Sequence, residues 1–312
     1  MRGEKIRELV DRSYVINARE KQMLVERISE STNYKEQFAG IASEVAQLQS
    51  GPLDRAALLD MRLRLEREGY AILKAPEESM GTNSSMVRCL MSSLRQLGPF
   101  LPQSKAGNLM HFVEPAENAP VHSFYSNSNI GGHIHTDGTF IHVPVPDYAT
   151  LICVTPADQG GDSLLVDGRR VVDYLKRHYP EEIPFLLKHE FYFDTDEQVA
   201  AGGFIKRNIL DLSGGAPRIQ YFRALIALGH DKAGVPLTDE EGRILNIFDE
   251  AISAPENVTS HKLLRGEMLI INNNTHLHSR EPFKPGAPGR AMPARLLLRV
   301  WTRLPPGSVV HH

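Results

Sequence analysis

The stretch that decides the fold runs from residue 268 to residue 280 and reads Met-Leu-Ile-Ile-Asn-Asn-Asn-Thr-His-Leu-His-Ser-Arg. It opens with a short apolar run, which ends in three asparagines, and two histidines follow at once. Short apolar runs separated by Gly, Pro, Asn and Asp recur from about residue 109 onward. This texture is typical of a sandwich or barrel of short strands.

The part of the chain before residue 99 has a helical pattern instead. Asp54 is the expected N-cap of a helix that ends at Gly69, and residues 70–73 form the expected strand after it. A second helix is expected to start at a cap on Ser84 or Ser85. Further along, strands are expected at 149–155, 163–166, 190–193, 218–223, 260–264, 268–271 and 294–302, and helices at 169–177 and 239–252.

Helices that come first and antiparallel strands that follow predict an α+β protein. We expect a double-stranded β-helix (jelly-roll) core with N-terminal helices and helical insertions. The expected organisation is a single domain over residues 1–312, with a mainly helical part at 1–98 and the core at 99–305. A lid-like insertion is expected around 195–252, because its first residues contain Gly202-Gly203 and few apolar positions.

Composition excludes several classes of partner. The 35 Lys and Arg residues against 38 Asp and Glu give a net charge of −3, so no basic surface for nucleic acid or anionic membrane is expected. Two cysteines are too few for a disulfide framework. No secretory signal or membrane-spanning run is visible. The sequence therefore predicts a cytoplasmic protein that acts on a small molecule, with its oligomeric state open.

Two histidine-rich segments carry the candidate chemistry. In Gly131-Gly-His-Ile-His-Thr-Asp-Gly138, the side chains of His133, His135 and Asp137 alternate by two and would share one face of an extended segment. Far downstream, His276 and His278 alternate in the same way. Two imidazoles and one carboxylate form the facial triad of non-haem Fe(II) oxygenases. Periodicity alone leaves open which histidine of each pair binds the metal.

Two arginines follow in the last expected strand. Arg295 and Arg299 are four residues apart in Ala294-Arg-Leu-Leu-Leu-Arg-Val-Trp301, so they face the same way. A buried arginine among Leu, Val and Trp is costly unless an anion pairs with it. The guanidinium fork suits a carboxylate. A site for a carboxylate ligand is therefore expected beside this strand, and an internal salt bridge is the alternative.

The ordered set of motifs resembles the taurine dioxygenase and clavaminate synthase-like family of Fe(II)/2-oxoglutarate-dependent oxygenases. The family pattern is a His-x-Asp/Glu motif, a Gly-Gly-Asp-Thr-like turn, an Asn-Arg-x-x-x-His-Gly-Arg segment and an Arg-x-x-x-Arg strand. The corresponding segments here are His135-Thr-Asp137, Gly160-Gly-Asp-Ser163, Asn273-Asn-Thr-His-Leu-His-Ser-Arg280 and Arg295-Leu-Leu-Leu-Arg299.

The resemblance implies a role for each matching residue. It makes His135, Asp137 and His278 both the catalytic centre and the iron ligands. It implies that Arg295 and Ser163 bind the far carboxylate of 2-oxoglutarate, and that Arg299 binds either the co-substrate or an anionic group of the substrate. The chain departs from the family pattern at Asn274, at Ser279 and in the longer gap before Arg295. That gap leaves Arg290 as a weaker candidate for the co-substrate role.

The implied activity is that of a dioxygenase, an oxidoreductase that consumes O2 and 2-oxoglutarate and releases succinate and CO2. Halogenating relatives replace the carboxylate ligand with a small residue, so the presence of Asp137 favours hydroxylation of an unactivated C–H bond. The expected substrate is a small polar molecule, either an amino-acid derivative or a natural-product intermediate of secondary metabolism. Desaturation or cyclisation, a non-catalytic small-molecule-binding barrel and zinc hydrolysis are the competing hypotheses.

Overall fold

The computed structural model of the 312-residue chain describes residues 34–104, 106–115, 129–139, 145–194, 204–284 and 293–305. Its central feature is a six-stranded antiparallel sheet in which β11 (Glu267–Asn272) and β4 (Tyr148–Thr155) are neighbours. Strand β1 (Tyr70–Lys74) lies beside β11, and β13 (Leu296–Thr302) lies beside β4. The far side of β13 pairs with both β2 (Phe100–Leu101) and β3 (Met110–Val113).

A second antiparallel sheet holds three strands in the order β10 (Val258–His261), β5 (Ser163–Asp167) and β12 (His276–Arg280). The two sheets share one buried cluster, which contains Cys153 of β4, Leu165 of β5, Leu269 of β11 and Leu297 of β13. Because these side chains come from both sheets, the sheets pack through their inner faces. The polar residues of β12 that face inward are therefore enclosed between the sheets.

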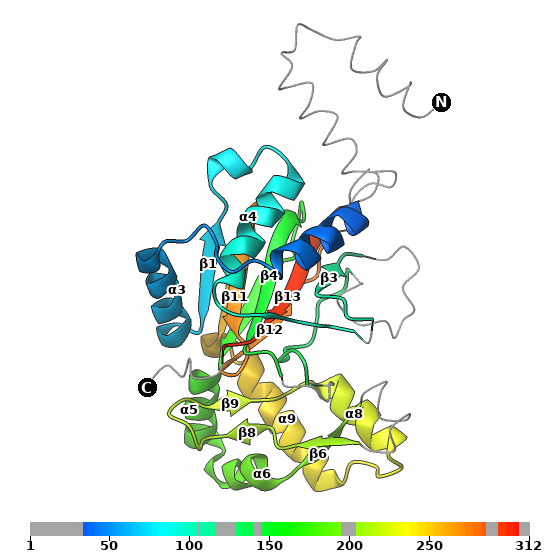
Figure 1. The fold of residues 1–312 in the computed structure, drawn as a ribbon. Helices are drawn as coiled ribbons and strands as arrows, with labels where there is room; N and C mark the ends of the chain where they lie inside the picture. Colours follow the sequence, from blue (N-terminus) through cyan, green and yellow to red (C-terminus); the bar gives the residue numbers. More distant parts are fainter. Residues whose placement is uncertain are drawn as a thin grey trace, which may run out of the picture.

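Helices α3 (Arg55–Arg67) and α4 (Asn83–Arg95) cover the outer face of the six-stranded sheet (Figure 1). Residues 34–45 are also helical and pack there. Met86, Leu90 and Leu94 of α4 recur on one side of the helix and belong to the same buried cluster as Leu296 and Leu298 of β13. The apolar side of α4 therefore packs into the core.

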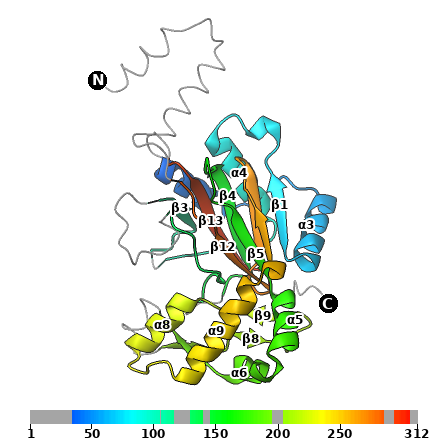
Figure 2. The ribbon, with the colours of Figure 1, turned by 180° about the vertical axis from the view of Figure 1, so that it is seen from behind.

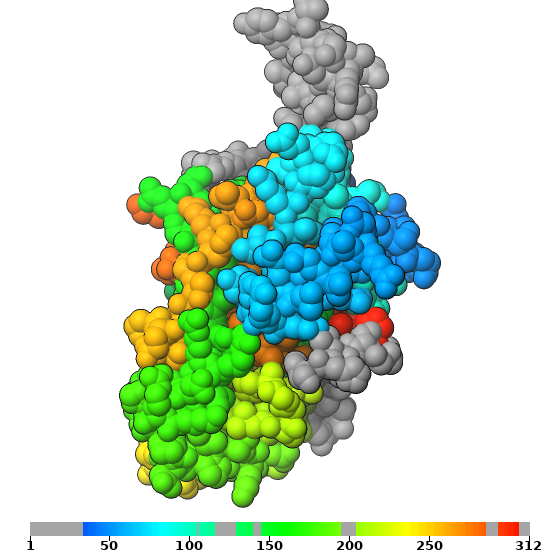
Figure 3. Space-filling view, turned by 90° about the vertical axis from the view of Figure 1, so that its left-hand side faces the viewer, coloured from blue at the N-terminus to red at the C-terminus, as the bar shows by residue number. Residues whose placement is uncertain are grey.

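The opposite end of the molecule holds a helical part and two small two-stranded sheets (Figures 1 and 2). This part consists of α5 (Gly168–His178), α6 (Ile183–Lys188), β6 (Phe191–Phe193), β7 (Ile205–Arg207), β8 (Leu210–Asp211), β9 (Arg218–Ile219), α8 (Arg223–Lys232) and α9 (Asp239–Ser253). In the space-filling view the blue α3 region and the green α5 region adjoin (Figure 3), and there Arg169 donates a hydrogen bond to the Arg67 carbonyl at 2.9 Å.

Most expected elements are present, with shifted ends. The expectation of helices first and antiparallel strands after them is confirmed. Asp54 caps α3 as expected, but the cap of α4 is Thr82, whose hydroxyl accepts the Ser85 N–H at 3.1 Å, so the choice of Ser84 or Ser85 was wrong. The strand expected at 218–223 stops at Ile219, because the chain turns into α8 at Arg223.

Residues 195–203 of the expected lid lie outside the described residues, whereas the rest of that insertion forms β7 to α9. Within the described part of the chain, no helix is both long and apolar enough to cross a bilayer.

Candidate metal centre

The two histidine segments meet through their backbones. His135 and His278 form an isolated antiparallel bridge, in which the His135 N–H donates to the His278 carbonyl at 3.0 Å and the His278 N–H donates to the His135 carbonyl at 2.8 Å. Two residues that lie opposite each other in such a bridge have side chains that are close together. The ring centroids of His135 and His278 accordingly lie 4.6 Å apart.

Asp137 completes the group. Its Oδ1 lies 3.8 Å from Nε2 of His135, and its Oδ2 lies 3.8 Å from Nε2 of His278. One ligand atom from each of the three residues fits within 4.8 Å of the other two. The two 3.8 Å separations fit donors that share a single ion at bond lengths of about 2.0–2.2 Å, and a small adjustment of the side chains brings all three donors to it. The imidazole and carboxylate donors suit a divalent iron ion and leave coordination positions for other ligands.

The protonation states also suit a metal. Burial lowers the pKa of His278 to about 3 and lowers the pKa of His135, so both imidazoles are neutral near neutral pH. Burial alone would raise the pKa of Asp137, but the surroundings, above all the positive charge of Arg299, outweigh it and hold that pKa at about 2. The group therefore offers two neutral nitrogens and one anionic oxygen, the forms in which these side chains bind metals.

The orientation of His135 is fixed by two contacts. Its Nδ1 lies 2.8 Å from the His133 carbonyl, which can only accept a hydrogen bond, so Nδ1 carries the proton and Nε2 keeps its lone pair. The ring of Phe222 lies against the His135 ring, with the centroids 4.6 Å apart. Nδ1 of His278, in contrast, is buried and has no hydrogen-bond partner among the described residues.

Asn273 holds the Asp137 backbone from both sides. Its Oδ1 accepts the Asp137 N–H at 2.8 Å, and its Nδ2 donates to the Asp137 carbonyl at 3.0 Å and to the Pro146 carbonyl at 3.0 Å. Asn273 is buried and directly follows β11. The amide thus ties the segment that carries Asp137 to the end of the six-stranded sheet.

The carboxylate of Asp137 receives two side-chain hydrogen bonds from β13. Arg299 donates from Nη1 to Oδ1 at 3.0 Å, and Trp301 donates from Nε1 to Oδ2 at 2.9 Å. Gln103 in turn accepts from Nε of Arg299 at 2.8 Å. Arg299 therefore contacts the carboxylate of the triad itself, and its predicted contact with the co-substrate or substrate stays a prediction.

Beside the triad lies a group of buried cations. Arg295 is 4% exposed, and its Nη2 lies 3.4 Å from the Gly161 carbonyl; among the described residues it forms no ion pair with a carboxylate. Arg280 is 9% exposed and donates to the Ile130 carbonyl at 2.8 Å. Both guanidinium groups lie near the ring of Phe283, with their carbons 5.5 and 4.7 Å from its centroid.

The register of the small sheet connects these cations to the triad. On β12, His278 and Arg280 are two residues apart and so share the inward face, where they are opposite Leu165 and Ser163 of β5. Burial lowers the pKa of Arg280 to about 10. Burial and the nearby charge of Arg280 lower the pKa of Arg295 to about 9. The buried positive charges of Arg280 and Arg295 therefore favour the binding of an anion between the sheets.

Periodicity left open which histidine of each pair binds the metal, and the two members of each pair differ in their surroundings. The only described group of three or more ligands that can hold a metal consists of His135, Asp137 and His278, and includes neither His133 nor His276. His276 is buried near the ring of Tyr70, with Nδ1 3.0 Å from the Thr275 hydroxyl. Arg290, the weaker candidate for the co-substrate role, lies outside the described residues.

Sequence reasoning gave no role to Trp301 or Arg280. A signal existed for Arg280, because it continues the period-two alternation of His276 and His278 along an extended segment. For Trp301 the same alternation with Arg299 places both side chains on one face of β13, but nothing in the sequence indicates that this face meets Asp137.

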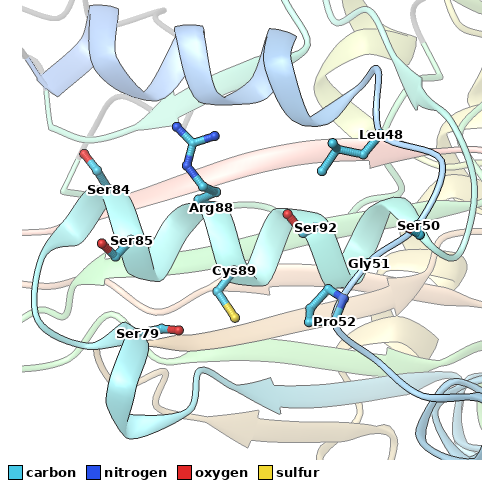
Figure 4. Close-up of a pocket in the computed structure, with 10 residues that line it drawn as sticks. All are labelled: Leu48, Ser50, Gly51, Pro52, Ser79, Ser84, Ser85, Arg88, Cys89 and Ser92. Carbon is cyan, nitrogen blue, oxygen red and sulfur yellow. The ribbon is translucent and has the colours of Figure 1, made fainter.

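A surface pocket of about 520 Å³ lies elsewhere, between α4 and the segment before α3 (Figure 4). It is lined by Leu48, Ser50, Gly51, Pro52, Ser79, Ser84, Ser85, Arg88, Cys89 and Ser92. None of the predicted site residues lines it. This pocket is therefore separate from the group of His135, Asp137 and His278.

Two packed antiparallel sheets beside a His-Asp-His group, with Asp137 and His278 buried and His135 partly exposed, are typical of a mononuclear metal enzyme of the facial-triad class. The chain matches the taurine catabolism dioxygenase TauD, TfdA family over residues 31–301, and it belongs to this family. It is accordingly an oxidoreductase, an oxygenase that depends on iron and 2-oxoglutarate.

Individual relatives agree with this family. The chain is 26% identical over 262 residues to FR-33289 synthase of Streptomyces rubellomurinus, covering 82% of this chain and 76% of the relative. Its fold is similar to that of asparagine oxygenase, solved with Fe(II), 2S,3S-3-hydroxyasparagine and succinate, at a TM-score of 0.63, 19% identity, and coverage of 88% and 91% of the two chains. It is also similar to the non-heme iron oxygenase OrfP, solved with Fe and alpha-ketoglutaric acid, at a TM-score of 0.58, 16% identity, and coverage of 86% and 92%.

Proposed function

We propose that the chain hydroxylates an unactivated C–H bond of a small polar molecule, with His135, Asp137 and His278 as the ligands of Fe(II). The single observation that carries this proposal is that three donors in the correct protonation states lie within 4.8 Å of one another, with Asp137 and His278 buried and His135 partly exposed. We further propose that the two packed sheets are the halves of a double-stranded β-helix, with the triad between them.

Arg295 and Ser163 would bind the far carboxylate of 2-oxoglutarate, and Arg280 would add a second positive charge. Arg280 is two residues from His278 along the strand, which corresponds to roughly 7 Å. A five-carbon dicarboxylate is long enough to bind a metal at one end and reach these groups with the other. Buried guanidinium groups bind such a carboxylate with charge-assisted hydrogen bonds, and its charge offsets theirs.

The metal and 2-oxoglutarate, when bound, supply the oxidation of a C–H bond by O2 with release of succinate and CO2. The residues of the chain orient the reactants and exclude water. Asn273, Arg299 and Trp301 hold Asp137 in place, and Phe222 covers the ring of His135. Such preorganisation lets the site bind its ligands without rearrangement.

The substrate class is proposed from the relatives and from the lining of the site. The asparagine oxygenase structure contains a hydroxylated amino acid, which supports an amino-acid derivative as the substrate here. Near the triad, His111 of β3 lies opposite Arg299 of β13, and Gln103, from the segment between β2 and β3, accepts a hydrogen bond from Arg299, so these polar side chains form a polar wall in our proposal. A polar wall of this kind suits a polar substrate rather than a hydrocarbon.

The test is turnover of 2-oxoglutarate. Purified protein is incubated with Fe(II), ascorbate, 2-oxoglutarate and a panel of amino-acid derivatives, and succinate is measured. We expect one class of compound to stimulate succinate release and to gain one oxygen atom, which mass spectrometry detects. A product that has lost two hydrogens instead indicates desaturation or cyclisation. Binding without succinate release, or activity with zinc in the absence of 2-oxoglutarate, contradicts the proposal.

A further inference from the structure

The indole of Trp301 occupies an unusual position for a core tryptophan. It is fully buried in β13, yet its N–H donates to Oδ2 of Asp137 at 2.9 Å. The other carboxylate oxygen, Oδ1, accepts from Arg299 at 3.0 Å. Each oxygen has two acceptor positions, so each donor leaves one lone pair of its oxygen available. Two donors on two oxygens fix the rotation of the carboxylate about its Cβ–Cγ bond.

The two donors also hold each other. Arg299 and Trp301 are two residues apart on the same face of β13, and the guanidinium carbon of Arg299 lies 4.8 Å from the centre of the Trp301 ring. Gln103 fixes Arg299 further, because it accepts from Nε at 2.8 Å and donates to the Arg299 carbonyl at 2.8 Å. The orientation of the Asp137 carboxylate is therefore set by a rigid strand.

We propose that Trp301 is a positioning residue for the metal: its indole N–H presets the Asp137 carboxylate and so increases the affinity of the triad for a divalent ion. This inference rests on the proposed function, because it takes Asp137 as a ligand. Hydrogen-bond partners of metal ligands contribute on the order of 10- to 100-fold to metal affinity in other proteins. Arg299 adds charge as well as orientation, so the neutral Trp301 donor gives the cleaner test.

The composition of the chain makes Trp301 measurable. It is the only tryptophan in the sequence, so the indole fluorescence of the protein comes from this one side chain. Co(II) binds imidazole and carboxylate ligands and absorbs visible light, and in air it is a stable substitute for Fe(II). We expect Co(II) to quench Trp301 emission with a stoichiometry of one ion per chain, and Asp137→Ala to abolish the quenching.

The decisive variant is Trp301→Phe, which keeps an aromatic ring in the core and removes the N–H. We expect its Kd for Co(II), measured by calorimetry, to rise on the order of 10-fold. Val300→Ala is the matched control, because Val300 is buried on the opposite face of the same strand and packs with the helices. Its thermal stability should fall while its Kd for Co(II) stays at the wild-type value.

Three outcomes overturn the inference. The first is an unchanged Kd in Trp301→Phe, and the second is an equal loss of affinity in Trp301→Phe and Val300→Ala, which indicates a structural role only. The third outcome needs only the wild-type chain, and so it tests the inference even if Trp301→Phe fails to fold. It is Trp301 emission that does not respond to saturating Co(II). A wild-type chain that binds no Co(II) at all contradicts the proposed function itself, and so the two failures are distinguishable.

Discussion

Arg280 of β12 lies directly opposite Ser163 of β5. His278 precedes Arg280 by two residues, shares its face of β12 and lies opposite Leu165. The proposed metal ligand His278 and the buried cation Arg280 thus share one pleated surface, separated by two residue rises of about 3.4 Å each. Arg295 directly precedes β13, which begins at Leu296 and so is shorter than the expected strand 294–302; its guanidinium contacts Gly161 and lies near Phe283. In the proposed function this surface binds a molecule with a chelating end and a carboxylate end.

The first prediction concerns these arginines. Arg295→Met removes the more deeply buried cation, and we expect the KM for 2-oxoglutarate to rise on the order of 100-fold, which corresponds to about 3 kcal/mol of lost binding. Arg280→Met should raise this KM about 10-fold, since Arg280 also donates to backbone carbonyls. Both variants should retain wild-type affinity for Co(II).

The matched control for these variants is Arg265→Met. Arg265 is also partly buried, but it donates to Asn83 and the Met80 carbonyl near the start of α4. Its KM for 2-oxoglutarate should not change. A similar rise in KM for all three arginine variants would show that the effect is general destabilisation.

The second prediction concerns the turn beside Arg295. Gly161 has a φ of +76°, and a Cβ there would lie 3.2 Å from Nε of Arg295 and 3.3 Å from Cβ of Phe283. Gly161→Ala should therefore displace the guanidinium and raise the KM for 2-oxoglutarate about 10-fold. Gly234 has a φ of +65°, and a Cβ there would meet no atom within 4 Å, so Gly234→Ala tests backbone strain alone.

We expect both glycine variants to lose about 1 kcal/mol of stability, measured by urea unfolding, because alanine is strained at positive φ. Only Gly161→Ala should change the KM. Equal KM values in the two variants would rule out the close approach of the turn to Arg295 as a determinant of co-substrate binding.

The third prediction concerns Asn273. Asn273→Leu keeps the approximate volume but leaves the N–H and carbonyl of Asp137 without their partners. Since buried unsatisfied groups cost about 1–3 kcal/mol each, we expect a loss of several kcal/mol in the free energy of unfolding, together with weaker Co(II) binding. Asn274→Leu alters the neighbouring, less buried amide, which donates to Asp147 at 3.1 Å, and should cost less than about 1 kcal/mol. Equal losses in the two variants would contradict the role given to Asn273.

The fourth prediction is a pH dependence of stability. Burial, with the nearby charge of Arg299, lowers the pKa of His111 from 6.5 to about 4. Between these two pH values the unfolded chain binds more protons at this site than the folded chain does, so protonation favours unfolding. The contribution is complete above pH 6.5 and is lost progressively as the pH falls toward 4.

His111→Gln has no titrating group at this position. The difference in urea midpoint between about pH 7 and about pH 4.5 should therefore be smaller in this variant than in the wild-type chain without metal. An unchanged midpoint difference in His111→Gln would be inconsistent with a neutral, buried His111.

The sequence allowed the apolar strands to be predicted, because β4, β5, β11 and β13 are runs of Val, Ile and Leu bounded by turn residues. It did not indicate that His276–Arg280 is itself a strand. All five residues of β12 are buried although four of them are polar, so the alternation of buried apolar and exposed polar residues that marks a strand in a sequence is absent.

The order of the motifs predicted that His135, Asp137 and His278 bind one metal; the structure brings their donor atoms within 4.8 Å of one another, and metal binding stays a prediction. The partners of its members were not predictable. Arg299 and Trp301 reach Asp137 only because β13 crosses the segment that carries Asp137, and a contact between residues so far apart in the chain depends on packing rather than on local pattern. The cap at Thr82 was missed for a simpler reason, since several hydroxyl residues in succession offer equivalent caps.

The most direct test of the central claim is succinate formation by the wild-type chain and by Asp137→Ala, each loaded with Fe(II) and supplied with 2-oxoglutarate, O2 and ascorbate. The account predicts that the wild-type chain converts 2-oxoglutarate to succinate and that Asp137→Ala, folded to the same extent by circular dichroism, neither binds Co(II) nor forms succinate. Succinate formation by Asp137→Ala at the wild-type rate would contradict the assignment of this group as the iron site.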